Sequence, residues 1–293
     1  MAISEVLSKQ LQELGLDPKN VANIVAATIA EDLAGGEDVT SNATIPADQV
    51  SSAEFVTRKP GVIAGLNIAA AVLECEGITD YEILVSEGSQ VDADRAVLRA
   101  KGDTRKLLLT ERTALNFLGR LSGIATLTNR WVAELKGTSA KVRDTRKTTP
   151  LFREFEKFAV RMGGGENHRM SLSDAALIKD NHIVAAGSAK NAFAKVRAAY
   201  PNLNLEVEVD SLDQLKEVVA AGAQLVLLDN MSLEQCRAAV EIVAGRTKLE
   251  ASGGLTLENA KAYGNTGVDY LAVGALTHSA PVLDIGLDMR MEK

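Results

Sequence analysis

The sequence predicts an α/β fold of the TIM-like barrel type, joined to a smaller α+β domain. From about residue 141, short apolar runs that end in a polar residue alternate with longer segments of helical periodicity. The runs are nearly continuous in hydrophobicity, which is typical of parallel strands covered on both faces. One strand and one helix together take about 20 to 25 residues, a repeat length that fits such a barrel.

The expected strands can be placed one by one in this region. They are the runs at 141–145, 176–180, 205–210, 225–229, 248–252 and 270–274. Three of the helices between them open with Ser211, Ser232 and Thr256, each followed by an acid or amide that favours an N-cap, and later glycines favour the helix ends. A complete set of eight strands is not evident from these runs.

The residues before about 115 predict a separate α+β sandwich domain. Helical segments reach about residue 33, a strand is expected at 53–58, a helix at 66–76, and hairpins in the alternating pattern of 81–102. The acids of the turn-rich segment 35–46 are interpreted as turn and capping residues rather than as catalytic ones.

A helical segment at 111–137 leads into the barrel. We expect the α+β domain to span 1–115, joined by the C-terminal residues 278–293, and the catalytic barrel domain to span 116–277.

Composition excludes several classes of protein. The formal net charge is -7, which argues against a general nucleic-acid or acidic-membrane binder. Cys75 and Cys236 lack metal-ligand spacing and are expected to be reduced. The first residues have charges throughout and no signal-peptide core, and no apolar run is long enough to span a bilayer. We therefore expect a soluble, cytoplasmic protein.

Cationic residues gather between residues 143 and 182 of this acidic chain. They are Arg143, Arg146, Lys147, Arg161, Arg169 and Lys179, beside turn-forming or Gly-rich sequence. Arg offers a planar fork and Lys a compact charge, so the mixture suits a small ligand that carries several anionic groups. The cluster predicts an anion pocket.

Polar residues also stand at or near the carboxyl ends of the expected strands, the face on which barrel enzymes build their sites. They are Asp144, Lys179, Glu208, Asp229 and Ser252. Gly-rich turns follow two late strands, at 252–255 and 273–279. Exposed backbone N–H groups in such turns complement a phosphate, so the sequence predicts a phosphate site there.

The chain resembles the quinolinate phosphoribosyltransferase family nearly from end to end. The motifs that carry the resemblance are EDLAGGEDVTS, ERTALNFLGRLSGIAT, RDTRKTTP, GGGENHR, ALIKDNH, EVEVDS, LLDN, ASGGL and DYLAVGALTHS. The resemblance implies an incomplete, open barrel beside an α/β sandwich domain.

The resemblance also implies an activity. The family transfers a phosphoribosyl group from phosphoribosyl pyrophosphate to quinolinate with Mg2+, and releases pyrophosphate and CO2 to give nicotinate mononucleotide for NAD biosynthesis. It implies a homodimer, or a larger assembly of dimers, in which the partner subunit completes each site.

Site residues follow from the same resemblance. The quinolinate-binding cations match Arg146, Lys147, His168, Arg169 and Lys179, with Arg112 reaching in from the neighbouring subunit. Glu208 and Asp229 match the carboxylates associated with the metal and the ribose diphosphate. Other substrate-binding positions match Thr145, Ser252, Gly253, Gly254, Val273, Gly274 and Ala275. The catalytic set would be Lys147, Lys179, Glu208 and Asp229, and the sequence does not choose which lysine handles charge or a proton.

Two other functions compete with this interpretation. One is a paralogue of the same fold that uses another aromatic acid, and the other is a non-catalytic sensor of phosphoribosyl pyrophosphate. The presence of both Glu208 and Asp229 beside the cations argues against the sensor, because phosphate binding alone needs no paired acids. His182 and His278 lie in separate motifs without a metal-ligand set, so structural roles are expected for them.

Overall fold

The computed structural model describes residues 3–291. The chain folds into two compact units: the first contains residues up to 127, 154–164 and those from 280 onward, and the second contains 128–153 and 165–279. The domain limits expected from the sequence stay a prediction.

The second unit is built on a parallel sheet. Its strands are β6 (Lys141–Arg143), β7 (Ala176–Ile178), β8 (Leu205–Val209), β9 (Leu225–Asp229), β10 (Lys248–Ser252) and β11 (Tyr270–Ala272). Their order is β6-β11-β10-β9-β8-β7, and every paired neighbour is parallel. The six predicted strands are confirmed.

The sheet is open, as the resemblance implied. β6 and β7 lie at its two ends and do not pair with each other. A parallel bridge between Arg143 and Glu166 extends the β6 end by one position. The segment that follows Glu166 is irregular up to β7 and carries His168 and Arg169.

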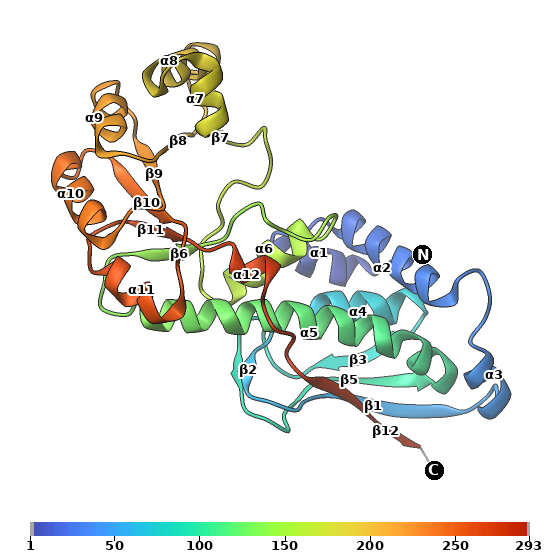
Figure 1. Ribbon diagram of the computed structural model, residues 1–293. Coiled ribbons are helices and arrows are strands. Elements are labelled where there is room, and N and C mark those ends of the chain that lie inside the picture. Colours follow the sequence, from blue (N-terminus) through green and yellow to red (C-terminus); the bar gives the residue numbers. More distant parts are fainter. Residues whose placement is uncertain (1–2, 292–293) are drawn as a thin grey trace. The chain divides into compact units, whose positions relative to one another are not determined.

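Helices connect successive strands of this sheet and lie along its outside (Figure 1). They are α7 (Asp180–Ala186), α8 (Ala189–Ala199), α9 (Leu212–Ala220), α10 (Leu233–Val243) and α11 (Leu257–Gly264). The short helix α12 (Ala275–His278) follows β11. The expected N-caps are confirmed: the side chains of Ser211, Ser232 and Thr256 each accept a hydrogen bond from the backbone N–H three residues later.

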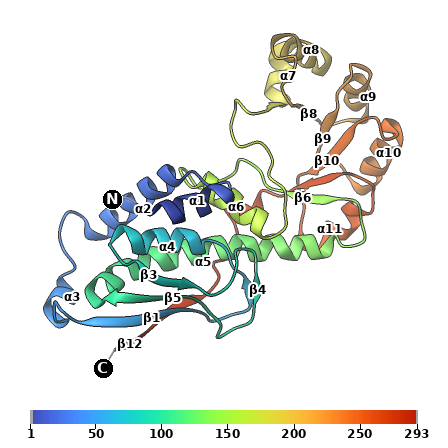
Figure 2. The same ribbon diagram turned by 180° about the vertical axis from the view of Figure 1, so that it is seen from behind.

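The first unit contains an antiparallel sheet of β1 (Val50–Thr57), β3 (Asp80–Ile83), β5 (Ala96–Asp103) and β12 (Ile285–Met291) in the order β12-β1-β5-β3. β2 (Gly61–Val62) pairs with β4 (Gln90–Val91). Helices α1 (Glu5–Glu13), α2 (Pro18–Leu33) and α4 (Leu66–Cys75) lie on one side of the larger sheet (Figures 1 and 2). The expected α+β character is thus confirmed.

Three further helices complete the description. α5 (Thr104–Glu134) overlaps most of the lead-in helix predicted at 111–137, but it begins seven residues earlier, directly after β5, and ends at Glu134. The turn-rich segment forms the short helix α3 (Val39–Thr44), whose N-terminal N–H groups of Thr40 and Ser41 donate to Asp38. α6 (Arg153–Met162) has no counterpart among the predicted elements. No helix within residues 3–291 combines the length and apolar character needed to cross a membrane; the compartment stays a prediction.

Candidate functional site

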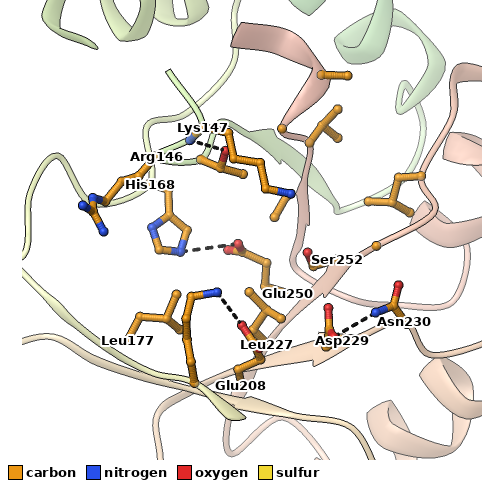
Figure 3. A pocket seen from close by; sticks show the side chains of 18 of the residues that line it. Arg146, Lys147, His168, Leu177, Glu208, Leu227, Asp229, Asn230, Glu250 and Ser252 are labelled. Atoms are coloured by element: carbon orange, nitrogen blue, oxygen red, sulfur yellow. Dashed lines mark hydrogen bonds and ion pairs between the residues drawn. The ribbon is translucent and has the colours of Figure 1, made fainter. Parts of the chain in front are cut away.

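The carboxyl ends of the parallel strands surround a hollow of about 760 Å3. Figure 3 shows Lys147, Glu208, Glu250 and Asp229 around this common space. Most of the site residues predicted from the sequence line this hollow. They are Thr145, Arg146, Lys147, His168, Arg169, Lys179, Glu208, Asp229, Ser252, Gly253, Gly254, Val273, Gly274 and Ala275. The fold therefore gathers residues from seven separate motifs into one site.

Arg112 is the exception. It lies on α5 in the first unit, is exposed, and is not among the residues that line the hollow. Its expected role in the site of a neighbouring subunit stays a prediction.

Cations occupy two loops of the hollow. The loop after β6 supplies Arg146 and Lys147, and the irregular segment before β7 supplies Arg169. Burial and repulsion from Arg146 lower the pKa of Arg169, which indicates that positive charge is concentrated without full compensation. The buried Nε of Arg146 and the ammonium of Lys147 have no hydrogen-bond or ion-pair partner within the described residues. This positive charge suits an anionic ligand.

Two carboxylates stand on neighbouring strands. Glu208 on β8 accepts a hydrogen bond from Lys179 Nζ at 3.0 Å, and Asp229 at the end of β9 accepts one from Asn230 Nδ2 at 2.8 Å (Figure 3). Within residues 3–291, the second oxygen of each carboxylate has no hydrogen-bond partner. These oxygens suit a hard cation or ribose hydroxyl groups.

The predicted phosphate loops have the required backbone. Gly253 has a φ of +89° and Gly254 one of +62°, in the left-handed region that favours glycine. A Cβ at Gly253 would lie 2.1 Å from Asn230 Oδ1, whereas one at Gly254 would meet nothing within 4 Å. Asn230 packs against the loop and its N–H donates to Ser252 O at 2.8 Å. The loop after β10 thus exposes backbone to the hollow while β9 supports it.

The second Gly-rich turn lies between two polar side chains. A Cβ at Gly274 would lie 3.0 Å from Lys147 Cδ and 3.2 Å from His278 Nε2. Lys147 O accepts a hydrogen bond from Thr277 Oγ1 at 2.7 Å, which fixes the loop after β6 against α12. A side chain at position 274 would therefore intrude on the hollow.

A buried polar cluster lies beneath the rim, and its two carboxyl groups, Glu206 and Glu250, were not singled out by the sequence analysis. Glu206 and Glu250 are 4% and 0% exposed, and His168 is 8% exposed. His168 Nε2 is 2.7 Å from Glu206 Oε2 and 3.6 Å from Glu250 Oε1, and Figure 3 shows the second of these pairs. Arg143 Nη1 is 2.6 Å from Glu250 Oε2. The available sequence signal was spacing: Glu206 and Glu250 stand two residues before Glu208 and Ser252, and so face the same side of their strands.

Burial raises the pKa of both carboxyl groups. The pKa of Glu206 rises to about 7, and that of Glu250 also rises to about 7 with a further contribution from repulsion by Glu206. Nearby Arg143 opposes both shifts. The protonation of this cluster therefore changes near neutral pH.

The fold and the hollow together define an α/β protein of the open-barrel class, with a site at the carboxyl edge of its sheet for a ligand that carries several anionic groups. Gly-rich turns and an acidic pair accompany the cations in that site.

The sequence of this chain matches known protein families. The model of the C-terminal domain of quinolinate phosphoribosyl transferase matches residues 124–288, and that of the N-terminal domain matches residues 38–122. A nicotinate-nucleotide pyrophosphorylase [carboxylating] of Mycobacterium leprae is 51% identical over 271 residues, which cover 90% of this chain and 95% of the relative. A quinolinate phosphoribosyltransferase [decarboxylating] of Nicotiana tabacum is 36% identical over 293 residues, covering 93% and 83%.

Solved structures agree. The crystal structure of NadC from Streptococcus pyogenes has a TM-score of 0.90 and 39% identity, covering 95% of this chain and 99% of that one. This chain belongs to the quinolinate phosphoribosyl transferase family.

The buried carboxyl of Glu250 predicts how stability varies with pH. Its pKa in the folded protein, about 7, lies above the ordinary value of 4.5, so the folded state holds more protons between these values. The free energy of unfolding should therefore fall as pH rises from about 4.5 to about 7. Glu250→Gln should flatten this slope, measured by urea unfolding at a series of pH values.

Glu241→Gln is the matched control, because Glu241 is exposed on α10. It should keep the slope of the unchanged protein. An equally steep slope in the Glu250→Gln protein would show that other groups produce it.

Proposed function

We propose that the protein transfers a phosphoribosyl group from phosphoribosyl pyrophosphate to the ring nitrogen of quinolinate and then decarboxylates the ring, giving nicotinate mononucleotide, pyrophosphate and CO2. This is a step in NAD biosynthesis. One observation carries the proposal: the cations, the paired acids and the Gly-rich turns converge on a single hollow in a chain of this family.

The cations support quinolinate as the acceptor. Quinolinate has two adjacent carboxylates, and several charge-assisted hydrogen bonds are needed to hold both in a confined site. Arg146, Lys147 and Arg169 come from two loops that line the hollow, and Lys147 is not paired within the described residues. Their positive charge would select a dianion over a monocarboxylate.

The Gly-rich turns and the acidic pair support the phosphoribosyl donor. Gly253, Gly254 and Gly274 line the hollow and have no side chains of their own, so their backbone N–H groups suit the 5′-phosphate. Glu208 and Asp229 line the same hollow and suit the ribose hydroxyl groups. The two substrates would therefore meet within this hollow.

Glu208 and Asp229 are also the residues proposed to associate with Mg2+. Carboxylate oxygens are the ligands that Mg2+ prefers, and each of these acids keeps one oxygen without a partner in the described part of the chain. When bound, the ion would neutralise charge on the diphosphate leaving group.

The chemistry requires orientation and electrostatics rather than a side-chain nucleophile. The pyridine nitrogen forms a bond to the anomeric carbon while the bond from that carbon to pyrophosphate breaks, and pyrophosphate keeps the electron pair. The nitrogen becomes cationic, so it stabilises the electron pair left on the ring when the neighbouring carboxylate departs as CO2. A proton then replaces the carboxylate. Lys147 and Arg169 would hold the ring in place throughout.

Product analysis tests this reaction. The purified protein, given quinolinate, phosphoribosyl pyrophosphate and Mg2+, should form CO2 and nicotinate mononucleotide in equal amounts, and omission of Mg2+ or addition of a chelator should suppress both. Product from another aromatic acid in place of quinolinate would favour the paralogue. Binding of phosphoribosyl pyrophosphate without turnover of any acceptor would favour the sensor.

Arg169→Ala should raise the KM for quinolinate about 10- to 100-fold, because one charge-assisted contact is worth about 1.5–3 kcal/mol. The fold should be retained, as judged by circular dichroism and thermal unfolding. Lys190→Ala, which removes an exposed positive charge on α8, is the control and should leave the KM unchanged. An Arg169→Ala enzyme with wild-type kinetics would remove Arg169 from the substrate site.

We further propose a homodimer, alone or within a larger assembly, in which Arg112 serves the neighbouring site. Arg112 is exposed and does not line the hollow of its own chain. Mixing Arg112→Ala subunits with Lys179→Ala subunits should restore part of the activity, because one site of each mixed dimer would have both residues intact. Verified mixed dimers without any restored activity would show that the sites are not shared.

A further inference from the structure

The buried cluster beneath the hollow contains a histidine whose two ring nitrogens are both engaged. His168 Nδ1 accepts a hydrogen bond from the backbone N–H of Arg169 at 2.7 Å. An accepting nitrogen carries no proton, so in the neutral ring the proton is on Nε2. Nε2–H then donates to Glu206 Oε2 at 2.7 Å.

This arrangement determines what the cluster can bind. Ligand atoms of His168, Glu206 and Glu250 lie within 4.8 Å of one another, a grouping that would fit a metal ion. A ring nitrogen that carries a proton has no lone pair for a metal, however, and Arg143 already places a positive charge 2.6 Å from Glu250. The geometry therefore favours a hydrogen-bonded support over a metal centre.

The backbone of the same segment is held separately. Asp144, fully buried at the end of β6, accepts the His168 N–H at 2.9 Å and a hydrogen bond from Asn167 Nδ2 at 2.6 Å. These bonds fix the main chain up to His168. The imidazole fixes the next peptide, because its Nδ1 is the acceptor for the Arg169 N–H.

We propose that Glu206 is a positioning residue: by holding the His168 ring through Nε2–H, it places Nδ1 under the Arg169 peptide and so presents the Arg169 guanidinium to a substrate carboxylate. Arg143 and Glu250 form the base of this support. The inference rests on the proposed function, in which Arg169 binds quinolinate.

The irregular backbone makes such a support necessary. Arg169 lies in a segment without helix or strand. Its guanidinium donates a hydrogen bond from Nη1 to Ala175 O at 3.2 Å. A helix or strand would fix the direction of the side chain through its own ladder of hydrogen bonds. Here a chain of side-chain bonds from β8 provides that direction instead.

Two substitutions at position 206 distinguish the effect of losing the hydrogen-bond acceptor from the effect of losing the negative charge. Glu206→Gln keeps a carbonyl oxygen for Nε2–H, whereas Glu206→Leu keeps a similar volume without any acceptor. The Leu variant should raise the KM for quinolinate about tenfold and leave the KM for phosphoribosyl pyrophosphate unchanged. The Gln variant should stay within about threefold of the wild type for both. Glu241→Leu, on the exposed side of α10, should change neither.

Nitrogen NMR of 15N-histidine-labelled protein reports directly which ring nitrogen of His168 carries the proton. The chain has three histidines, and the signals of His168 are identified by their loss in His168→Gln. The wild type should show an unprotonated Nδ1 and a protonated Nε2. The Gln variant should keep this pattern, and the Leu variant should lose it.

Three outcomes would overturn the inference. They are a protonated Nδ1 in the wild type, an unchanged quinolinate KM in a folded Leu variant, and stoichiometric metal in the wild type that disappears in that variant. The wild-type NMR measurement decides the inference even where the Leu variant does not fold. Absence of wild-type turnover would refute the proposed function, whereas the tautomer of His168 is measured independently of turnover.

Discussion

The pocket depends on buried polar groups being paired with one another inside the sheet. Glu250 has no exposed surface, and a lone carboxylate in such a place would be very costly. Arg143 compensates it from two strands away and is itself held 4.4 Å above the ring of Tyr270. This pairing allows a polar floor to exist beneath the substrate hollow where most barrels place apolar side chains.

The buried cluster and the site above it are built from the same parallel strands and form two layers of side chains on one face of the sheet. Glu206 and Glu208 are two residues apart on β8, and Glu250 and Ser252 are two residues apart on β10, so each strand contributes one residue to each layer. Register places Ser252 beside Asp229 on β9. The acids of the rim and the phosphate loop are therefore brought together by backbone hydrogen bonds, and side-chain bonds then adjust their direction.

The sequence predicts the sheet well because each strand of the second unit is a short apolar run bounded by polar and turn residues. It also predicts the lining of the hollow, because Lys179, Asp229 and Ser252 stand where strands end. The partnership of Arg143 with Glu250 is different: alternation tells which face a residue occupies but not which residue of another strand it meets. The state of the His168 ring likewise depends on one backbone N–H in an irregular segment, for which no periodicity exists.

The helices also show that features set by adjacent residues can be predicted from the sequence, whereas features set by distant residues cannot. Capping of α9, α10 and α11 follows from adjacent residues and was predictable, whereas α6 forms between two stretches of loop without such a repeat.

The pairing of β12 with β1 has a consequence for the order in which the chain can fold during synthesis. Residues 285–291 pair with residues 51–57, although every strand of the parallel sheet lies between them in sequence. A nascent chain that has not yet emerged past residue 285 therefore exposes an unpaired edge of β1 while all the strands of the second unit are already available. The antiparallel sheet begins early in translation and is completed last.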